Sequence, residues 1–300
     1  MKYLIALILL LLVVPTHAER VKIKWTGDYE HNSPRTWSRE NKYESGWSRN
    51  FQNGAPEEGG KVDKNGELNG LLLMPKNVSE QVPFVVLMHP CGGLDGYNTA
   101  WIEMMADKFN AAGFGVIAPD SYSTRSMAIK CGSGGGIHWG YRRGEDAYAA
   151  MDYVVQKRLA RPESVFVVGY SNGGLSALAA MFSRMKDHPN KFAAGFAIVP
   201  HCGPVPIKSS NFYNPVVIFS GDEDTLTPAR YCEELGRKKR STPVQLVILK
   251  GANHGFMFDR APAVYEGVKY SYNIAAAGYT IDSIINAMRT KQFVNSTVYK

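Results

Sequence analysis

Short apolar runs alternate with helical patterns along most of this chain, and this alternation constrains the fold more than any other feature. The runs are continuous and mostly β-branched, as is typical of parallel strands buried on both faces. They cover residues 71–74, 84–89, 114–118, 165–169, 193–199, 216–220 and 245–249. Helical patterns cover residues 101–111, 145–159, 174–185, 228–239 and 281–288. We therefore expect an α/β fold with a mostly parallel central sheet and helices on both of its faces.

The first 18 residues have the features of a secretory signal peptide. Lys2 precedes an apolar run of 11 residues, 4–14, and small residues lead to a cleavage position after Ala18. The run is shorter than the ~20 residues that a membrane-spanning helix needs. We expect the mature protein to be secreted or periplasmic, without stable insertion in a membrane.

The next part of the chain, residues 19–60, has a different composition. It is polar, rich in Asn, Ser, Arg and Gly, and without a sustained period of 2 or 3.6 residues. This composition predicts an irregular N-terminal arm. Its tryptophans, Trp25, Trp37 and Trp47, indicate that the arm packs against another surface, and residues 61–300 form the remaining domain.

The charge of the chain gives little support to nucleic acid binding. The 34 Lys and Arg residues outnumber the 27 Asp and Glu residues, for a formal net charge of +7. The longest basic run, residues 237–240, follows a helical pattern and is typical of a solvated helix end. We therefore expect no nucleic acid partner.

The segment most informative about chemistry is Gly169-x-Ser171-x-Gly173. It lies between a β-branched strand and a helical pattern, which is the context of a nucleophile elbow. Such a turn holds the serine in a strained conformation, so small residues are needed two positions before and after it. The following helix directs its N-terminal amides toward the oxygen that becomes negative in acyl transfer. We predict that Ser171 is a nucleophile.

A serine nucleophile needs a histidine base and a carboxylate that orients the histidine. The strand 216–220 ends in an acidic loop in which Asp224 precedes the next helix, and Asp222 is the alternative acid. Solvation or helix capping would also explain these acids. His254 follows the strand 245–249. The order Ser171, Asp224, His254 is that of an α/β-hydrolase triad.

Two backbone N–H groups are expected to bind the oxyanion. Asn172, directly after the nucleophile, supplies one of them. The other should come from the glycine-containing turn after the strand 84–89, where Cys91 is our first choice and Gly92 the alternative. Pro90 is excluded because it has no N–H.

With these motifs, the chain resembles the dienelactone hydrolase family of the α/β-hydrolases. The likeness rests on the Ser171 elbow, the Asp224 loop, His254-Gly-Phe and His89-Pro-Cys-Gly-Gly, and it spans about residues 61–288. It implies that residues 61–300 form an α/β-hydrolase domain that cleaves esters or lactones without a metal or organic cofactor. The enzyme that names the family resembles a cysteine hydrolase, whereas this elbow carries Ser171, which argues against the dienelactone substrate itself.

The chain has four cysteines, an even number that suggests two disulfides in an exported protein. Three pairings are open, and no C-x-x-C spacing supports zinc binding or thiol-disulfide chemistry. The family resemblance implies the pairs Cys91–Cys131 and Cys202–Cys232.

Candidates for the substrate pocket are less sharply defined. The loops 120–125 and 132–139, with Arg142 and Arg143 after them, are candidates to line it, although loop structure and helix capping would also explain them. Arg125 and Tyr170 are the substrate-binding residues we select. Arg125 or Arg142 would hold a carboxylate-bearing substrate.

The leading hypothesis is a serine esterase that cleaves carboxylic esters or lactones of small molecules through an acyl-enzyme. A serine peptidase acting on small peptides is a second hypothesis. A non-catalytic binding module on a hydrolase scaffold is a third, because fold alone does not prove function. No feature of the sequence indicates an oligomeric state.

Overall fold

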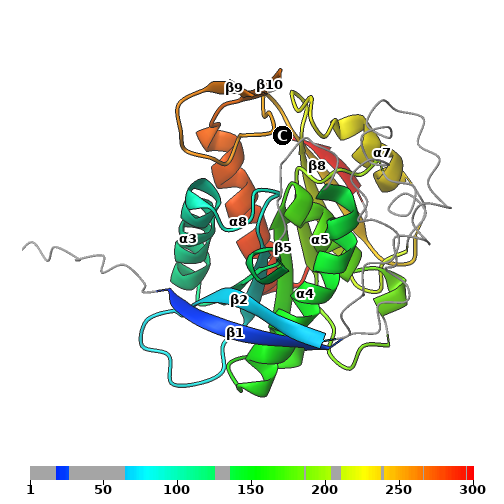
Figure 1. The fold of residues 1–300 in the computed structure, drawn as a ribbon. Coiled ribbons are helices and arrows are strands. Elements are labelled where there is room, and N and C mark those ends of the chain that lie inside the picture. The colour runs from blue at the N-terminus through cyan, green and yellow to red at the C-terminus, as the bar shows by residue number, and fades with distance from the viewer. Residues whose placement is uncertain are drawn as a thin grey trace, which may run out of the picture.

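A central sheet with helices on both faces forms the body of the protein (Figure 1). The computed structural model describes residues 18–26, 65–125, 136–185, 187–203, 211–237, 240–265, 267–294 and 296–300. Within these residues the sheet has nine strands in the order β1-β2-β4-β3-β5-β6-β7-β8-β11. From β4 to β11 neighbouring strands are parallel, which confirms the mostly parallel sheet expected from the sequence.

The buried parallel strands match the apolar runs of the sequence closely. Their backbone groups pair with neighbouring strands, so continuous β-branched segments can be buried on both faces. Their bounds are β3 Phe84–Met88, β4 Gly115–Asp120, β5 Val165–Tyr170, β6 Gly195–Ile198, β7 Val216–Gly221 and β8 Val244–Leu249. The edge strand β11, Ser296–Tyr299, was not expected, because a short polar run at the chain end has no clear strand pattern.

The N-terminal arm begins as a strand, so the expectation of an irregular segment from residue 19 is wrong for its first residues. Strand β1, Glu19–Thr26, pairs antiparallel with β2, Asn65–Leu73, and Trp25 lies opposite Gly66. Val21, Ile23 and Trp25 are buried, whereas the lysines between them are exposed. This is a period of two residues, the signal of a half-buried strand, within an otherwise polar segment. The rest of the arm, 27–60, and residues 1–17 of the expected signal peptide lie outside the described residues.

Helices cover the two faces of the sheet in two groups (Figure 1). Side chains of α4, α5 and α7 pack into one apolar core, and those of α3 and α8 pack into the other. The bounds are α3 Gly96–Ala111, α4 Gly136–Gln156, α5 Asn172–Ala180, α7 Ala229–Arg237 and α8 Ile274–Thr290. The described residues also form the short 3₁₀ helices η2 Ser123–Arg125, η3 Pro162–Ser164 and η4 Ser183–Met185.

The helices differ from the sequence expectations mainly at their ends. Helix α5 ends at Ala180, before the expected end at residue 185, and the separate turn η4 follows it. Helix α8 begins at Ile274, seven residues before the expected start at 281, with Asn273 as its N-cap. Between β8 and α8 lies a hairpin that we did not expect, formed by β9 Ala263–Tyr265 and β10 Val268–Tyr270.

The packing of β1 predicts that this strand contributes to stability. Ile23 is fully buried against the core shared with α4. We expect Ile23→Ala to lower the free energy of unfolding by about 2–5 kcal/mol, measured by urea denaturation. Lys24→Ala, on the exposed face of the same strand, should change it by less than about 0.5 kcal/mol. Equal, small effects of the two variants would contradict the packing of β1 on the core.

Candidate active site

Ser171 lies on a sharp turn between β5 and α5. Its backbone has φ 54° and ψ −116°, in a region that residues with a side chain rarely adopt. Two hydrogen bonds hold the turn. The Ser171 N–H donates to the Ile198 carbonyl at 2.8 Å, and the Ser171 carbonyl accepts from the Leu175 N–H at 3.0 Å. The turn therefore has the conformation of a nucleophile elbow.

The two glycines of the motif allow α5 to approach the sheet very closely. A Cβ on Gly169 would lie 2.0 Å from the Gly173 carbonyl oxygen, and a Cβ on Gly173 would lie 2.2 Å from the Met88 carbonyl oxygen. Both contacts are with backbone, so no side-chain movement would relieve them. The elbow consequently depends on glycine at both positions, and α5 begins directly against the end of β3.

His254 is brought to the serine by the loop after β8. Its Nε2 atom lies 2.9 Å from Ser171 Oγ, and both side chains are largely buried. Asn253 anchors the loop, because its Oδ1 accepts from the Gly255 N–H at 2.9 Å and from the Ser271 N–H at 3.0 Å. The imidazole is thus positioned by a loop that is itself tied to the end of β10.

Asp224 completes a chain of hydrogen bonds. Its Oδ2 lies 2.8 Å from His254 Nδ1. Asp224 Oδ1 accepts from the N–H groups of Leu226 and Thr227, each at 2.9 Å, and Oδ2 accepts from the Thr227 hydroxyl at 2.7 Å. Burial alone would raise the pKa of Asp224, but the attraction of His254 and these hydrogen bonds hold the pKa below its ordinary value of 3.8. Asp224 is therefore ionised at neutral pH.

The alternative acid, Asp222, has a different place in the structure. Its side chain is exposed, and its Oδ1 accepts from the Gly251 N–H at 2.7 Å. It therefore joins the loop after β7 to the loop after β8. The structure brings Asp224, and not Asp222, to His254.

This arrangement sets the direction of proton transfer. Asp224 has only acceptor oxygens when ionised, so His254 Nδ1 carries a proton toward it and Nε2 of the neutral ring is free to accept from Ser171 Oγ. All three residues follow the C-terminal ends of parallel strands β5, β7 and β8. The geometry fits a Ser-His-Asp triad.

The two expected oxyanion donors lie on adjoining segments. Asn172 is the first residue of α5, and Cys91 and Gly92 lie in the turn after β3, where the Gly93 N–H donates to the Pro90 carbonyl at 3.3 Å. The contact of Gly173 with the end of β3 places this turn beside the elbow.

The structure changes the assignment of two candidate substrate residues. Tyr170 is 1% exposed, so its side chain does not line a pocket. Its hydroxyl donates to the backbone carbonyl of His254 and thereby supports the loop that carries this histidine. Arg143 is 0% exposed and does not line the pocket either. The side chains of Arg125 and Arg142 and the loop 126–135 lie outside the described residues.

One of the two expected disulfides is confirmed. Cys202 and Cys232 are joined, which links the segment after β6 to α7. Cys91 is also disulfide-bonded. Its expected partner, Cys131, lies outside the described residues.

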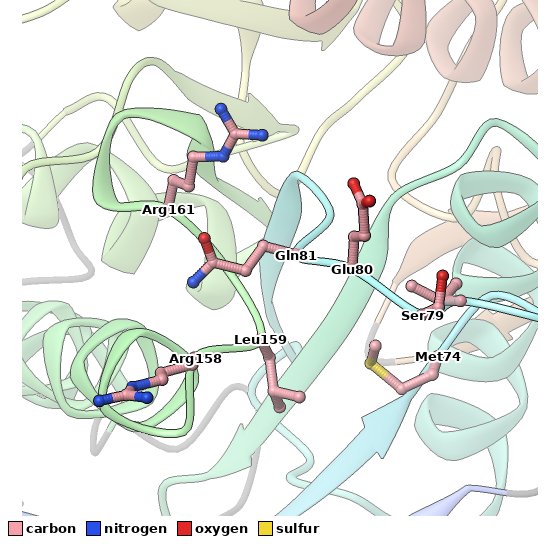
Figure 2. A pocket seen from close by; sticks show the side chains of 8 residues that line it. Met74, Ser79, Glu80, Gln81, Arg158, Leu159 and Arg161 are labelled. Carbon is pink, nitrogen blue, oxygen red and sulfur yellow. The ribbon is translucent and has the colours of Figure 1, made fainter.

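A cavity of about 770 Å³ lies away from the triad, lined by residues that include Glu80, Gln81, Arg158 and Arg161 (Figure 2). Gln81 precedes β3 and Arg161 precedes β5, so this cavity opens at the N-terminal ends of the strands. The triad lies at their C-terminal ends. We therefore do not assign this cavity to the candidate active site.

Neither a metal-binding cluster nor a membrane-spanning helix is present in the described parts of the chain. No group of three or more His, Cys, Asp and Glu side chains there is arranged to hold a metal ion. No helix in these parts is both long and apolar enough to cross a bilayer.

Sequence reasoning missed several residues that support the triad. Thr227 joins Asp224 to the Val199 carbonyl, which its hydroxyl contacts at 3.1 Å. The spacing Asp224-x-x-Thr227 before Pro228 is a signal of a local side-chain to backbone turn and could have indicated this role. Tyr270 packs edge-on against His254 with ring centroids 6.0 Å apart. No sequence signal points to that contact, because it depends on the unexpected β9–β10 hairpin.

Comparison with known proteins identifies the family to which this chain belongs. The sequence profile of the dienelactone hydrolase family matches residues 68–291, so the chain belongs to this family. Its fold is that of the α/β-hydrolases. No curated protein sequence matches the chain with significance.

Solved structures with the same fold are distant in sequence. A putative dienelactone hydrolase from Klebsiella pneumoniae subsp. pneumoniae MGH 78578 has 15% identity and a TM-score of 0.58, covering 75% of this chain and 93% of that one. Esterase 2 of Thermogutta terrifontis, phosphoramylated by tabun, has 16% identity and a TM-score of 0.56 over 78% and 93%. A dienelactone hydrolase-like promiscuous phosphotriesterase from metagenomic libraries has 17% identity and a TM-score of 0.55 over 75% and 92%.

The lowered pKa of Asp224 predicts a pH-dependent contribution to stability. The ionised carboxylate stabilises the fold above its ordinary pKa of 3.8, and this contribution is lost as the pH falls through the lower pKa of the folded state. We expect Asp224→Asn to reduce the free energy of unfolding by about 1.5–3 kcal/mol at pH 7. The difference from the unsubstituted protein should shrink below about pH 4 in urea denaturation series.

The control for this experiment is Asp222→Asn, which changes an exposed carboxylate of the same loop. It should alter the free energy of unfolding at pH 7 by less than about 0.5 kcal/mol. A penalty for Asp224→Asn that stays constant from pH 7 to pH 3 would contradict the assignment.

Proposed function

We propose that this member of the dienelactone hydrolase family is a serine esterase that cleaves carboxylic esters or lactones of small molecules. The observation that carries the proposal is the buried hydrogen-bond chain from Ser171 Oγ through His254 to Asp224. The family and the esterase of the same fold support hydrolysis as the reaction class. The fold alone does not identify a substrate.

The reaction begins with attack of Ser171 Oγ on the carbonyl carbon of the ester. His254 Nε2 takes the proton of the hydroxyl as the new C–O bond forms. Asp224 keeps the other ring nitrogen protonated and stabilises the imidazolium. The carbonyl π electrons move to oxygen, and the N–H groups of Asn172 and Cys91 bind this oxyanion, with Gly92 as the alternative to Cys91.

Collapse of the tetrahedral intermediate releases the alcohol. The C–O bond to the alcohol breaks, the imidazolium of His254 gives its proton to the leaving oxygen, and an acyl group remains on Ser171. Water then attacks the acyl carbon while His254 accepts its proton. The second intermediate expels Ser171 Oγ, which recovers its proton from His254, and a carboxylic acid leaves. For a lactone the alcohol and acid belong to one product.

We also propose that the protein acts outside the cytoplasm after its first 18 residues are removed. The basic, apolar and small-residue order of that segment supports export. The disulfide Cys202–Cys232 agrees with an oxidising compartment.

The test is hydrolysis of p-nitrophenyl esters from acetate to long acyl chains. We expect turnover by the mature protein, and a loss of about 10⁴-fold or more in kcat for Ser171→Ala, because this variant lacks the hydroxyl that forms the acyl-enzyme. The series also gives the preferred acyl length. Turnover that is unchanged in Ser171→Ala would contradict the proposal. No turnover, with no labelling of Ser171, would also contradict it and would favour the binding module.

Ser220→Ala is the matched control. Ser220 is a fully buried serine at the end of β7, and its hydroxyl has no hydrogen-bond partner among the residues that the structure describes. Removing an unsatisfied hydroxyl costs little stability. This variant should keep the kcat of the unsubstituted protein.

A further inference from the structure

Arg143 of α4 is fully buried and donates hydrogen bonds to groups around the elbow. Its Nε donates to Ser121 Oγ at 3.2 Å, and Nη1 donates to the Tyr122 hydroxyl at 3.3 Å. Nη1 also donates to Asn172 Oδ1, and Nη2 donates to the backbone carbonyl of His89. The guanidinium is thus surrounded by acceptors and is distant from solvent.

These acceptors belong to three segments that surround the nucleophile. His89 follows β3 and leads into the turn that holds Cys91, Ser121 and Tyr122 follow β4, and Asn172 begins α5. A guanidinium has five N–H donors in a planar fork with fixed geometry, so one side chain can hold several segments at set separations. A lysine has a single ammonium group and lacks this planar arrangement of donors.

His89 is a second link between Arg143 and the turn. The Ser121 N–H donates to His89 Nε2 at 3.2 Å, so Nε2 is the acceptor and the proton is on Nδ1, 2.7 Å from the Pro90 carbonyl. Burial and the nearby Arg143 charge lower the pKa of His89 well below its ordinary value of 6.5, so the ring is neutral. Arg143 and His89 together fix the backbone directly before Cys91.

The charge of Arg143 persists despite its burial. Burial lowers the pKa of Arg143, and nearby Tyr122, Asp146 and Asp120 act in the opposite direction. An unpaired buried cation would be costly, so this cluster of acceptors and carboxylates is needed to keep it in place. The protein therefore keeps a buried positive charge in contact with the Asn172 side chain.

We propose that Arg143 is the positioning residue of the oxyanion hole, an inference that rests on the proposed esterase function. By bonding the Asn172 side chain and the His89 carbonyl, it holds the N–H groups of Asn172 and Cys91 where the oxyanion forms. Arg143 itself touches no substrate. The donors must be in place before the reaction, because their effect depends on preorganised geometry and is realised in the transition state.

The test measures kcat and KM for a p-nitrophenyl ester. Arg143→Gln should lower kcat by about 10²-fold while KM changes by less than about 3-fold, since removal of a single oxyanion donor costs 10²–10³-fold. Arg143→Lys, which keeps charge without the fork, should recover part of the loss. Asn172→Ala keeps its backbone N–H but lacks the acceptor for Arg143, and should lower kcat by about 10-fold.

Two further measurements separate positioning from general destabilisation. The double variant Arg143→Gln with Asn172→Ala should lose no more kcat than Arg143→Gln alone, because both remove one coupled interaction. A trifluoromethyl ketone forms an oxyanion on the serine, so its inhibition constant should rise by the same factor as kcat/KM falls.

Tyr148→Phe is the matched control on the same helix. Its buried hydroxyl donates to the Ala180 carbonyl at 3.0 Å, away from the oxyanion turn. This variant should lower the melting temperature without changing kcat.

The outcomes distinguish this inference from the proposed function. Unchanged kcat in Asn172→Ala and Arg143→Gln, with an active unsubstituted protein, would overturn the inference alone. A rise in KM at constant kcat would also overturn it, because Arg143 would then contribute to substrate binding. If Arg143→Gln does not fold, Asn172→Ala decides. An unsubstituted protein without turnover or Ser171 labelling would overturn both.

Discussion

The close approach of α5 to the sheet is the constraint on which the rest of the active site depends. Gly169 and Gly173 allow backbone contacts that any Cβ would block, and the resulting turn holds Ser171 at φ 54°. Strain of this kind persists only where the surrounding structure imposes it. Here the bond from the Ser171 N–H to the Ile198 carbonyl and the packing of α5 on β3 impose it. The same contact brings the helix N-terminus to the turn after β3.

The other members of the site depend on the convergence of parallel strands. Loops after β7 and β8 meet the elbow because all three strands end at one edge of the sheet. Thr227 connects the acid loop to the end of β6 through the Val199 carbonyl, and the Cys202–Cys232 disulfide fixes the segment that follows. Asp224 is thus held by two neighbouring strands, which explains how a loop residue can be buried and ordered.

Much of the fold and the triad could be predicted from the sequence because the relevant signals are local. A β-branched run followed by Gly-x-Ser-x-Gly specifies its own turn. Asp224 follows the later apolar run 216–220, and His254 follows the run 245–249. What could not be predicted depends on contacts between distant segments. Strand β1 does carry a local signal, the alternation of Val21, Ile23 and Trp25, but it lies in an otherwise polar segment, whereas β9 and β10 have only three residues each and no period to detect. The burial of Arg143 and Tyr170 likewise follows from packing, so residues chosen as pocket lining are in fact supports behind the site.

The proposed mechanism requires that Ser171 is an activated nucleophile. Its most direct test is a fluorophosphonate reaction with the native protein, followed by mass spectrometry of the peptides. We expect one adduct per chain, on Ser171, that does not form after denaturation or in His254→Ala, because the hydroxyl needs the imidazole as its base. Labelling of another serine, or equal labelling of Ser171 with and without His254, would contradict it.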